Sequence, residues 1–499
     1  MLELNGQRLT LKQVAAVASG VEHVALSAAA RARVEESRRV VEKIVAQGRT
    51  VYGVNTGFGK LSDVHIEPSQ LCQLQLNLVR SHSCGLGPPL SEAEARAMLL
   101  LRANVLAHGY SGCRPVLIER LIAMLERGVM PVIPEKGSVG ASGDLAPLAH
   151  LALAIIGKGE AFYRGERLLG AEALRRAGIE PLQLEVKEGL ALLNGTQSMA
   201  AVGALALHRA ERVAGIADVA GAMTLEALRC TPVAFDERIQ KARPHPEQLA
   251  VAAHLRELLR DSEIRRSHLE NDPRVQDAYS LRCMPQVHGA VRGALSHARE
   301  VVEIETGSAT DNPLVFSDTG EVLSGGNFHG APLALSFDYA AIALTDLMSI
   351  SERRIDRLVN PDLNEDLPPF LTAHPGTSSG FMMMQVTAVA LLSEAKVLAH
   401  PASTDNVPTD GGKEDHVSMG MTAATKLRSI VENAEHLTAI ELITAAEGLE
   451  YRAPLQPGRG VKQAYEIVRA HVPPLINDRP LAPDILKIVE AIRHGEFAP

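Results

Sequence analysis

The chain has 499 residues, of which 46% are hydrophobic, and a formal net charge of −9. A chain of this length builds one very large domain or two to three smaller ones, and its apolar fraction suffices for a substantial core. The mild acidity and the lack of a basic run argue against nucleic acid and anionic membranes as partners. The start, MLELNGQRLT, lacks the layout of a signal peptide, and no apolar stretch is predicted to span a membrane. Five scattered cysteines without a C-x-x-C pair fit reduced thiols in the cytoplasm.

Apolar residues recur at helical spacing along most of the chain. Those between positions 34 and 45 predict a helix that ends at Gly48. A second helix should begin at Pro115 and end at Gly128. The alanine-rich stretch 195–228 predicts helices buried on most sides. Further helices are expected at about 249–259, 333–356, 381–400 and 420–447.

Signals for β-strands are few and short. They occur at 161–163 and at 314–316, the latter followed by a turn and by 322–323. We therefore predict an all-α fold, in which long helices form a bundle, loops carry the chemistry and a few short strands occur.

The most informative segment is the loop at 137–150, GSVGASGDLAPLAH. Its Ala141-Ser142-Gly143 tripeptide can cyclise when the amide nitrogen of Gly143 attacks the carbonyl carbon of Ala141 and a water is lost. Loss of a second water turns the Ser142 side chain into a methylene, and the product, a 4-methylidene-imidazol-5-one, is a strong electrophile. A helix should begin just downstream with Asp144 as its N-cap, so that its positive end faces the ring.

The tripeptide alone does not establish this chemistry, because the chain contains it twice. Ala18-Ser19-Gly20 follows an apolar helical stretch, where Gly20 is explained as a helix C-cap. The second copy differs in context, since it lies among regularly spaced glycines and precedes Asp-Leu-Ala-Pro-Leu. The spacing Gly-x-x-Gly-x-x-Gly is not that of a dinucleotide-binding loop.

Other polar and aromatic residues lie on loops between the predicted helices. Tyr52 lies in the glycine-punctuated loop YGVNTGFG, and His82 stands two residues before Cys-Gly-Leu-Gly. Asn194 precedes Gly-Thr-Gln, Phe328 lies in Asn-Phe-His-Gly, and Glu414 follows a glycine pair and a lysine. Each alone is explained as a mobile turn, a helix start or a charged loop.

Gln276, Tyr279 and Arg282 stand three residues apart and would share one face of a helix. Alone, such a set is explained as a solvated or salt-bridged face. The 18 histidines form no H-E-x-x-H motif or Cys/His cluster, so no metal site is predicted.

In their order and spacing these segments resemble the aromatic amino acid ammonia-lyase family, and above all its histidine-specific members. The resemblance runs from the Tyr52 loop to Asn477-Asp478-Arg479 and Ala482-Pro483-Asp484 near the end. It implies non-oxidative deamination of L-histidine to trans-urocanate and ammonia, the first step of histidine degradation.

The resemblance also implies an architecture. We expect a long-helix bundle of the ammonia-lyase and fumarase type, assembled as a homotetramer whose active sites draw residues from several subunits. Residues 1–193 should form a mostly helical part that carries the electrophile. Residues 194–499 should form the long bundle and C-terminal helices, and the two parts together make one catalytic unit.

Roles carried over from the family cover every candidate. The electrophile replaces any external cofactor, and the catalytic residues would be Ala141, Ser142, Gly143, Tyr52, Tyr279 and Glu414. The residues assigned to substrate binding are His82, Asn194, Gln276, Arg282 and Phe328. Tyr52 would be the general base or proton shuttle, and Arg282 would grip the substrate carboxylate as a bidentate clamp. His82 and Glu414 match positions that face the substrate side chain.

Alternatives within the family stay open. The chain could be a tyrosine or phenylalanine ammonia-lyase, or a 2,3-aminomutase, with the same electrophile; such relatives usually carry a more apolar pair at Ser81-His82. Lys413 stands where histidine-specific members commonly have glutamine. The sequence does not decide whether the substrate's amine or its ring attacks the electrophile.

Two alternatives lie outside the family. The signature of the fumarase superfamily, Gly-Ser-x-x-Met-Pro-x-Lys-x-Asn, is absent from the sequence. A non-enzymatic scaffold would not need these residues beside a cyclisable tripeptide.

Overall fold

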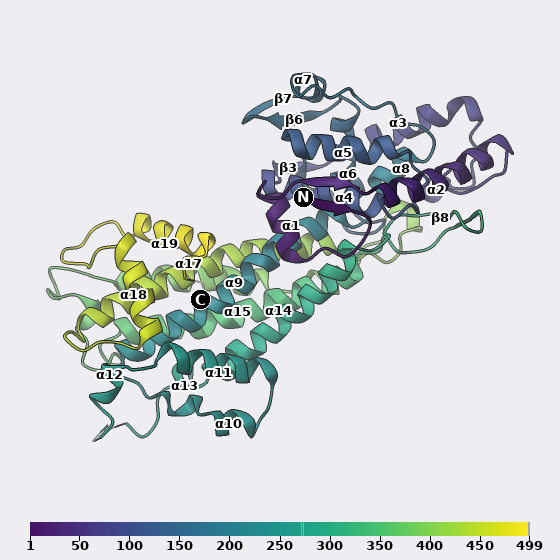
Figure 1. The fold of residues 1–499 in the computed structure, drawn as a ribbon. Coiled ribbons are helices and arrows are strands. Elements are labelled where there is room, and N and C mark those ends of the chain that lie inside the picture. The colour runs from purple at the N-terminus through teal and green to yellow at the C-terminus, as the bar shows by residue number, and fades with distance from the viewer. Residues whose placement is uncertain (271, 273, 498–499) are drawn as a thin grey trace. The chain divides into compact units, whose positions relative to one another are not determined.

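The computed structural model describes residues 1–270, 272 and 274–497 and is predominantly helical, which confirms the predicted all-α class (Figure 1). These residues group into two compact units. Unit 1 comprises Met1–His208, Ala298–Asp338 and Pro401–Thr425; unit 2 comprises Arg209–His297, Tyr339–His400 and Lys426–Pro499. Long helices contribute residues to both units: α9 (Gln197–Ala227), α14 (Met284–Thr306), α15 (Ala331–Val359) and α17 (Gly420–Glu450).

Unit 1 is built around α4 (Glu92–Leu106), which is buried along most of its length and packs against α1 and α5. Its other helices are α1 (Leu11–Ala18), α2 (Ala28–Ala46), α3 (Leu71–His82), α5 (Pro115–Arg127), α6 (Leu145–Ile155), α7 (Gly170–Arg176) and α8 (Glu188–Leu193). The side-chain oxygen of Gln75 in α3 accepts a hydrogen bond of 2.9 Å from the backbone of Gly189 in α8. Both α3 and α8 also pack against α6. The end of α3 carries His82, and Asn194 follows the last residue of α8.

The helix ends follow from the residues that cap them. Pro115 is the first residue of α5, and Gly128 ends it in the left-handed conformation, with a φ of 72°. Gly48 follows α2 with a φ of 65°, and Gly20 follows α1 with a φ of 76°. These observations confirm the predicted ends at Gly48 and Gly128 and the capping explanation of the first Ala-Ser-Gly copy.

The strands are short and all belong to unit 1. β6 (Glu160–Tyr163) pairs antiparallel with β4 (Val129–Pro131) on one side and β7 (Glu166–Leu169) on the other. β8 (Leu314–Phe316) pairs with β9 (Glu321–Leu323). The segments predicted as strands are strands. The parallel pair β1 (Leu2–Leu4) and β2 (Val24–Leu26), and the irregular pair β3 (Leu86–Pro89) and β5 (Pro134–Lys136), carry too few alternating residues to have been predicted.

In unit 2, buried ion pairs and hydrogen bonds connect the remaining parts of the long helices. Arg354 of α15 and Glu441 of α17 are both fully buried and form an ion pair with an N–O distance of 2.5 Å. Glu441 also accepts from Thr224 of α9, and Asp218 of α9 accepts from His288 of α14 at 2.7 Å. The other helices of this unit are α10 (Glu237–Lys241), α11 (Pro246–Leu258), α12 (Glu263–Arg266), α13 (Tyr279–Arg282), α16 (Met382–Leu398), α18 (Arg459–His471) and α19 (Ala482–His494).

Two segments of the described chain have the length and composition of membrane-spanning helices. Ala331–Val359 is 72% buried over its most apolar window, as a core helix of a soluble protein would be. Met382–Thr404 is only 22% buried over its window. The second segment therefore exposes a long apolar face.

Candidate active site

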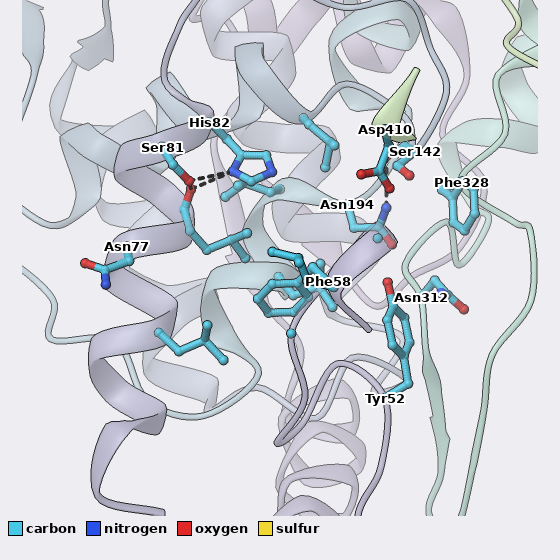
Figure 2. A pocket seen from close by; sticks show the side chains of 18 of the residues that line it. Tyr52, Phe58, Asn77, Ser81, His82, Ser142, Asn194, Asn312, Phe328 and Asp410 are labelled. Carbon is cyan, nitrogen blue, oxygen red and sulfur yellow. Dashed lines mark hydrogen bonds between the residues drawn. The ribbon is translucent and has the colours of Figure 1, made fainter. Parts of the chain in front are cut away.

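A cavity of about 560 Å³ in unit 1 collects most of the candidate residues (Figure 2). Apolar side chains from the Tyr52 loop, α3, α6 and α8 form much of its wall. Six predicted site residues line it together: Tyr52, His82, Ser142, Asn194, Phe328 and Glu414. These residues come from loops and helix ends that are far apart in the sequence, so the fold assembles the site.

The loop that carries Ser142 is bent by glycines and pressed against a second glycine segment. Gly140 and Gly143 have positive φ angles of 67° and 70°, a region that favours glycine. Gly143 forms an isolated parallel bridge with Gly195. A Cβ atom at Gly143 would also collide with the backbone of Gly195. Position 143 therefore requires glycine for two reasons, the positive φ angle and the lack of space for a side chain.

Asp144 fastens this loop to the start of α9 rather than to its own helix. It precedes α6 as predicted, but its side chain makes no capping hydrogen bond to that helix. Its carboxylate instead accepts from Met199 N at 2.8 Å and from Ser138 Oγ at 2.7 Å, while its own N–H donates to Gly195 O at 2.8 Å. Complete burial raises its pKa to about 6.

Ser142 is hydrogen-bonded on both its backbone and its side chain. The Nδ2 of Asn194 donates to the Ser142 carbonyl oxygen at 2.9 Å. The Ser142 hydroxyl donates to Oε1 of Glu414 at 2.5 Å, and Thr409 donates to Oε2 of Glu414 at 2.5 Å. An amide donor therefore faces the carbonyl oxygen that the cyclised ring would keep, and a carboxylate accepts from the hydroxyl that would leave.

His82 is the last residue of α3 and lies across the cavity from Tyr52 in Figure 2. Its Nδ1 lies 2.9 Å from the carbonyl oxygen of Leu78 and 3.0 Å from Ser81 Oγ. A carbonyl oxygen only accepts hydrogen bonds, so Nδ1 carries a proton. In neutral His82 the remaining Nε2 is therefore an acceptor.

Tyr52 lies in the loop that follows α2, and the backbone of this loop meets the loop that carries Glu414. Lys60 N donates to Oδ2 of Asp410 at 3.1 Å. Burial raises the pKa of Tyr52, and the negative charges of Asp410 and Glu414 raise it further. The phenol is therefore held in its protonated form more strongly than a free tyrosine.

The candidates Gln276, Tyr279 and Arg282 belong to unit 2 and do not line this cavity. Tyr279 and Arg282 are the ends of the short helix α13, whereas Gln276 precedes it, so the predicted helical face through all three residues is not formed. The Arg282 guanidinium lies 4.5 Å from the centre of the Tyr279 ring. Its Nε is buried and lacks a hydrogen-bond partner among the described residues.

Several residues that line the cavity were not predicted from the sequence as site residues. Phe58, Asn77, Asn312 and Asp410 all line the cavity and are labelled in Figure 2. Phe58 lies in the recognised Tyr52 loop, but Asn77 is an ordinary polar position in a helix. Asn312 and Asp410 lie in turns, where such residues are common for local reasons. Only the packing of the loops reveals that they share a site.

A largely apolar cavity is lined by the serine of a cyclisable Ala-Ser-Gly, by an amide donor, by a phenol and by a carboxylate. Together with the bundled long helices, this arrangement is that of a carbon–nitrogen lyase. Residues 9–470 match the aromatic amino acid lyase family, and the chain belongs to this family.

Its relatives agree in sequence and structure. A histidine ammonia-lyase of Anaeromyxobacter sp. (strain K) is 57% identical over 502 residues, covering 99% of each chain. One of Myxococcus xanthus is 54% identical, covering 99% of this chain and 97% of its own. The crystal structure of histidine ammonia-lyase from Trypanosoma cruzi matches with a TM-score of 0.92 and 43% identity over 99% of this chain and 94% of that chain. Tyrosine aminomutase from Streptomyces globisporus matches with a TM-score of 0.95 and 40% identity over 99% and 97%.

The two Ala-Ser-Gly copies allow a matched test of the contact at Gly143. Both glycines have a φ near 70°, but the nearest atom to a Cβ at Gly20 is the Arg96 guanidinium at 3.7 Å. Gly20→Ala should therefore cost only the conformational penalty of about 1–2 kcal/mol. Gly143→Ala should cost more, because the backbone at Gly195 must move. Chemical denaturation of both variants measures this, and equal losses would contradict the close contact.

Proposed function

We propose that this chain eliminates ammonia from L-histidine to give trans-urocanate, as the first step of histidine degradation. The observation that carries the proposal is that His82 and Glu414 line the same cavity as Ser142. A carboxylate and an imidazole suit a substrate whose side chain is itself a hydrogen-bonding imidazole. The high identity to proteins named histidine ammonia-lyase supports the same substrate.

The electrophile in this proposal is a 4-methylidene-imidazol-5-one formed from Ala141, Ser142 and Gly143, with no external cofactor. The residues present fit it: the space behind Gly143 admits no side chain, and Asn194 donates to the Ser142 carbonyl oxygen. When formed, this group supplies an electron sink that makes ammonia a competent leaving group. Loss of the Ser142 hydroxyl leaves Oε1 of Glu414 without that donor and available to a substrate N–H.

The protein residues bind the substrate and move its protons. Tyr52 is the base or proton shuttle toward the β-carbon, with Glu414 and Tyr279 as further proton-transfer groups. Arg282 binds the substrate carboxylate, and its buried Nε without a partner supports a role in binding an anion. Gln276 and Phe328 complete the binding of the substrate.

The proposed assembly is a cytoplasmic homotetramer that completes each site with residues from several subunits. The exposed apolar face of α16 supports it, since large exposed apolar patches in soluble proteins mark protein contacts. The large apolar residues that this helix exposes are Met382, Met383, Val386, Val389 and Val397. No nucleic acid or membrane partner is proposed.

Ser142→Ala should fold normally and lose nearly all lyase activity, because no methylene can form without the hydroxyl. Intact-mass measurement should find the wild-type chain lighter by two water molecules and the variant without that double loss. Ser19→Ala is the matched control in the other tripeptide and should change neither mass loss nor activity. A wild-type chain of full mass with undiminished activity would refute the proposed electrophile.

Tyr52 should impose an alkaline pH dependence. Its raised pKa keeps the phenolate scarce near neutrality, so kcat/KM should rise as the pH increases toward that pKa. Tyr52→Phe should lower kcat by about 10²–10⁴-fold with little change in KM, and the alkaline rise should disappear. If Tyr52→Phe keeps the alkaline rise in kcat/KM, a group other than Tyr52 must be the base.

The polar pair should make the enzyme prefer histidine over phenylalanine and tyrosine. Phenylalanine offers no hydrogen bond to Nε2 of His82 or to Oε1 of Glu414, which costs roughly 1–3 kcal/mol for each polar atom that the bound substrate buries. Sites built around substrate hydrogen bonds reject analogues without them by about 10⁴–10⁵. His82→Leu combined with Glu414→Gln should erode this preference mainly by loss of histidine activity.

The kcat/KM values for the three amino acids measure this directly. A wild-type enzyme that favours tyrosine or phenylalanine would end the histidine assignment but not the lyase assignment. Accumulation of a β-amino acid instead of urocanate would identify an aminomutase.

A further inference from the structure

Arg102 lies in the middle of α4 with its side chain fully buried. Its guanidinium donates to the carbonyl oxygens of Ala191 and Asn194 and to the side-chain oxygen of Gln197; the bond to Asn194 O is 2.9 Å long. Among the described residues, none of its hydrogen-bond partners is a carboxylate. Burial of a cation in this way is costly, and it lowers the pKa of Arg102 to about 10.

The three acceptors lie on one short stretch, from the end of α8 to the first residue of α9. The carbonyls of Ala191 and Asn194 lie at the negative end of α8, where a cation is favourable. Gln197 is fixed on its other side, because its Nε2 donates to Thr310 Oγ1 at 2.8 Å. The guanidinium therefore sets the position of the turn at 191–197 from within the core.

This turn is the one that contacts the tripeptide. Its Asn194 Nδ2 donates to Ser142 O, and its Gly195 O accepts from Asp144 N. A Cβ atom at Gly195 would collide with the Arg102 guanidinium, just as a Cβ at Gly143 would collide with Gly195. The Arg102 guanidinium thus lies against Gly195, and Gly195 lies against Gly143. Since neither glycine has a side chain that could adjust, a shift of the turn at Gly195 should also shift the tripeptide.

We propose that Arg102 is a positioning residue of the reaction: it holds the turn at 191–197 against the tripeptide so that Asn194 can donate to the Ser142 carbonyl oxygen. It touches neither substrate nor the reacting atoms and acts through Asn194. The inference rests on the proposed function, because the oxygen it serves is the one that gains negative charge when the electrophile accepts an amine. Fixed donors at such an oxygen are a large source of catalysis.

A matched control is present on the same helix. Arg96 of α4 also donates to backbone carbonyls near helix ends, Val17 O at 3.2 Å and Leu125 O at 3.3 Å, but these lie away from the cavity. Arg102→Met and Arg96→Met both remove a guanidinium that binds backbone oxygens. Only the first should affect the site.

The experiment compares Arg102→Met, Arg102→Lys, Arg96→Met and Asn194→Ala with the wild-type full-length protein. Arg102→Met should lower kcat by about 10²-fold, the effect of a small misplacement, with KM within about threefold of wild type. Arg102→Lys keeps the charge without the planar fork and should fall between Arg102→Met and wild type. Amide hydrogen exchange of peptides covering 137–150 should accelerate in both Arg102 variants and not in Arg96→Met, because Asp144 N–H loses a fixed acceptor.

A double-mutant cycle separates positioning from general stability. If Arg102 acts through Asn194, then Arg102→Met should add little to the loss caused by Asn194→Ala, whereas Arg96→Met should act independently. Multiplicative losses for Arg102→Met and Asn194→Ala, or unchanged exchange at 137–150, would overturn the proposal. If Arg102→Met does not fold, Arg102→Lys is carried through the same cycle. A wild-type chain without two-water loss and without lyase activity would refute the proposed function instead, while the exchange measurement still tests the placement of the turn.

Discussion

The site depends on one contact, in which the backbone at Gly143 meets the backbone at Gly195 with no side chain between them. Hydrogen bonds cross this contact in both directions, from Asn194 to Ser142 O and from Asp144 N to Gly195 O. The carboxylate of Asp144 extends the connection to the first turn of α9. Because these bonds are buried and reciprocal, neither segment can shift without leaving several polar groups unpaired. The loop is therefore held in one conformation by the segment at 194–199.

The same burial changes the ionisable groups around the contact in a consistent way. It raises the pKa of Asp144 and of Tyr52 and lowers that of Arg102. In each case the low-dielectric interior disfavours the charged form. Such an interior also strengthens every remaining electrostatic interaction, so the Asn194 donor and the Glu414 carboxylate act more strongly there than in water.

Local chemistry explains what the sequence could predict. Gly48, Gly128 and Gly20 end helices because left-handed backbone conformations suit glycine, and this rule needs no tertiary information. The loop at 137–150 could be recognised because its chemistry is encoded in adjacent residues. The family resemblance placed His82 and Glu414 beside it, and the cavity contains both. By contrast, the Asp144 carboxylate accepts a hydrogen bond from α9 and does not cap α6. The sequence could not predict this partner, because α9 is far from Asp144 in the sequence and approaches it only through tertiary packing. Arg102 belongs to no recognisable motif. From the sequence alone, an arginine within a helix is predicted to lie on the surface, so its burial could not be foreseen.

The two Ala-Ser-Gly copies separate sequence from environment. In the first, Ser19 ends a helix, its hydroxyl donates to Ala16 O at 3.0 Å, and a Cβ at Gly20 would meet the Arg96 guanidinium only at van der Waals distance. In the second, the serine hydroxyl meets a carboxylate, its carbonyl meets an amide donor, and the glycine meets another backbone. The two tripeptides are identical in sequence, so under the proposed function any difference in their reactivity must come from the groups around the second copy. The surrounding fold, and not the tripeptide itself, would then decide which copy becomes the electrophile.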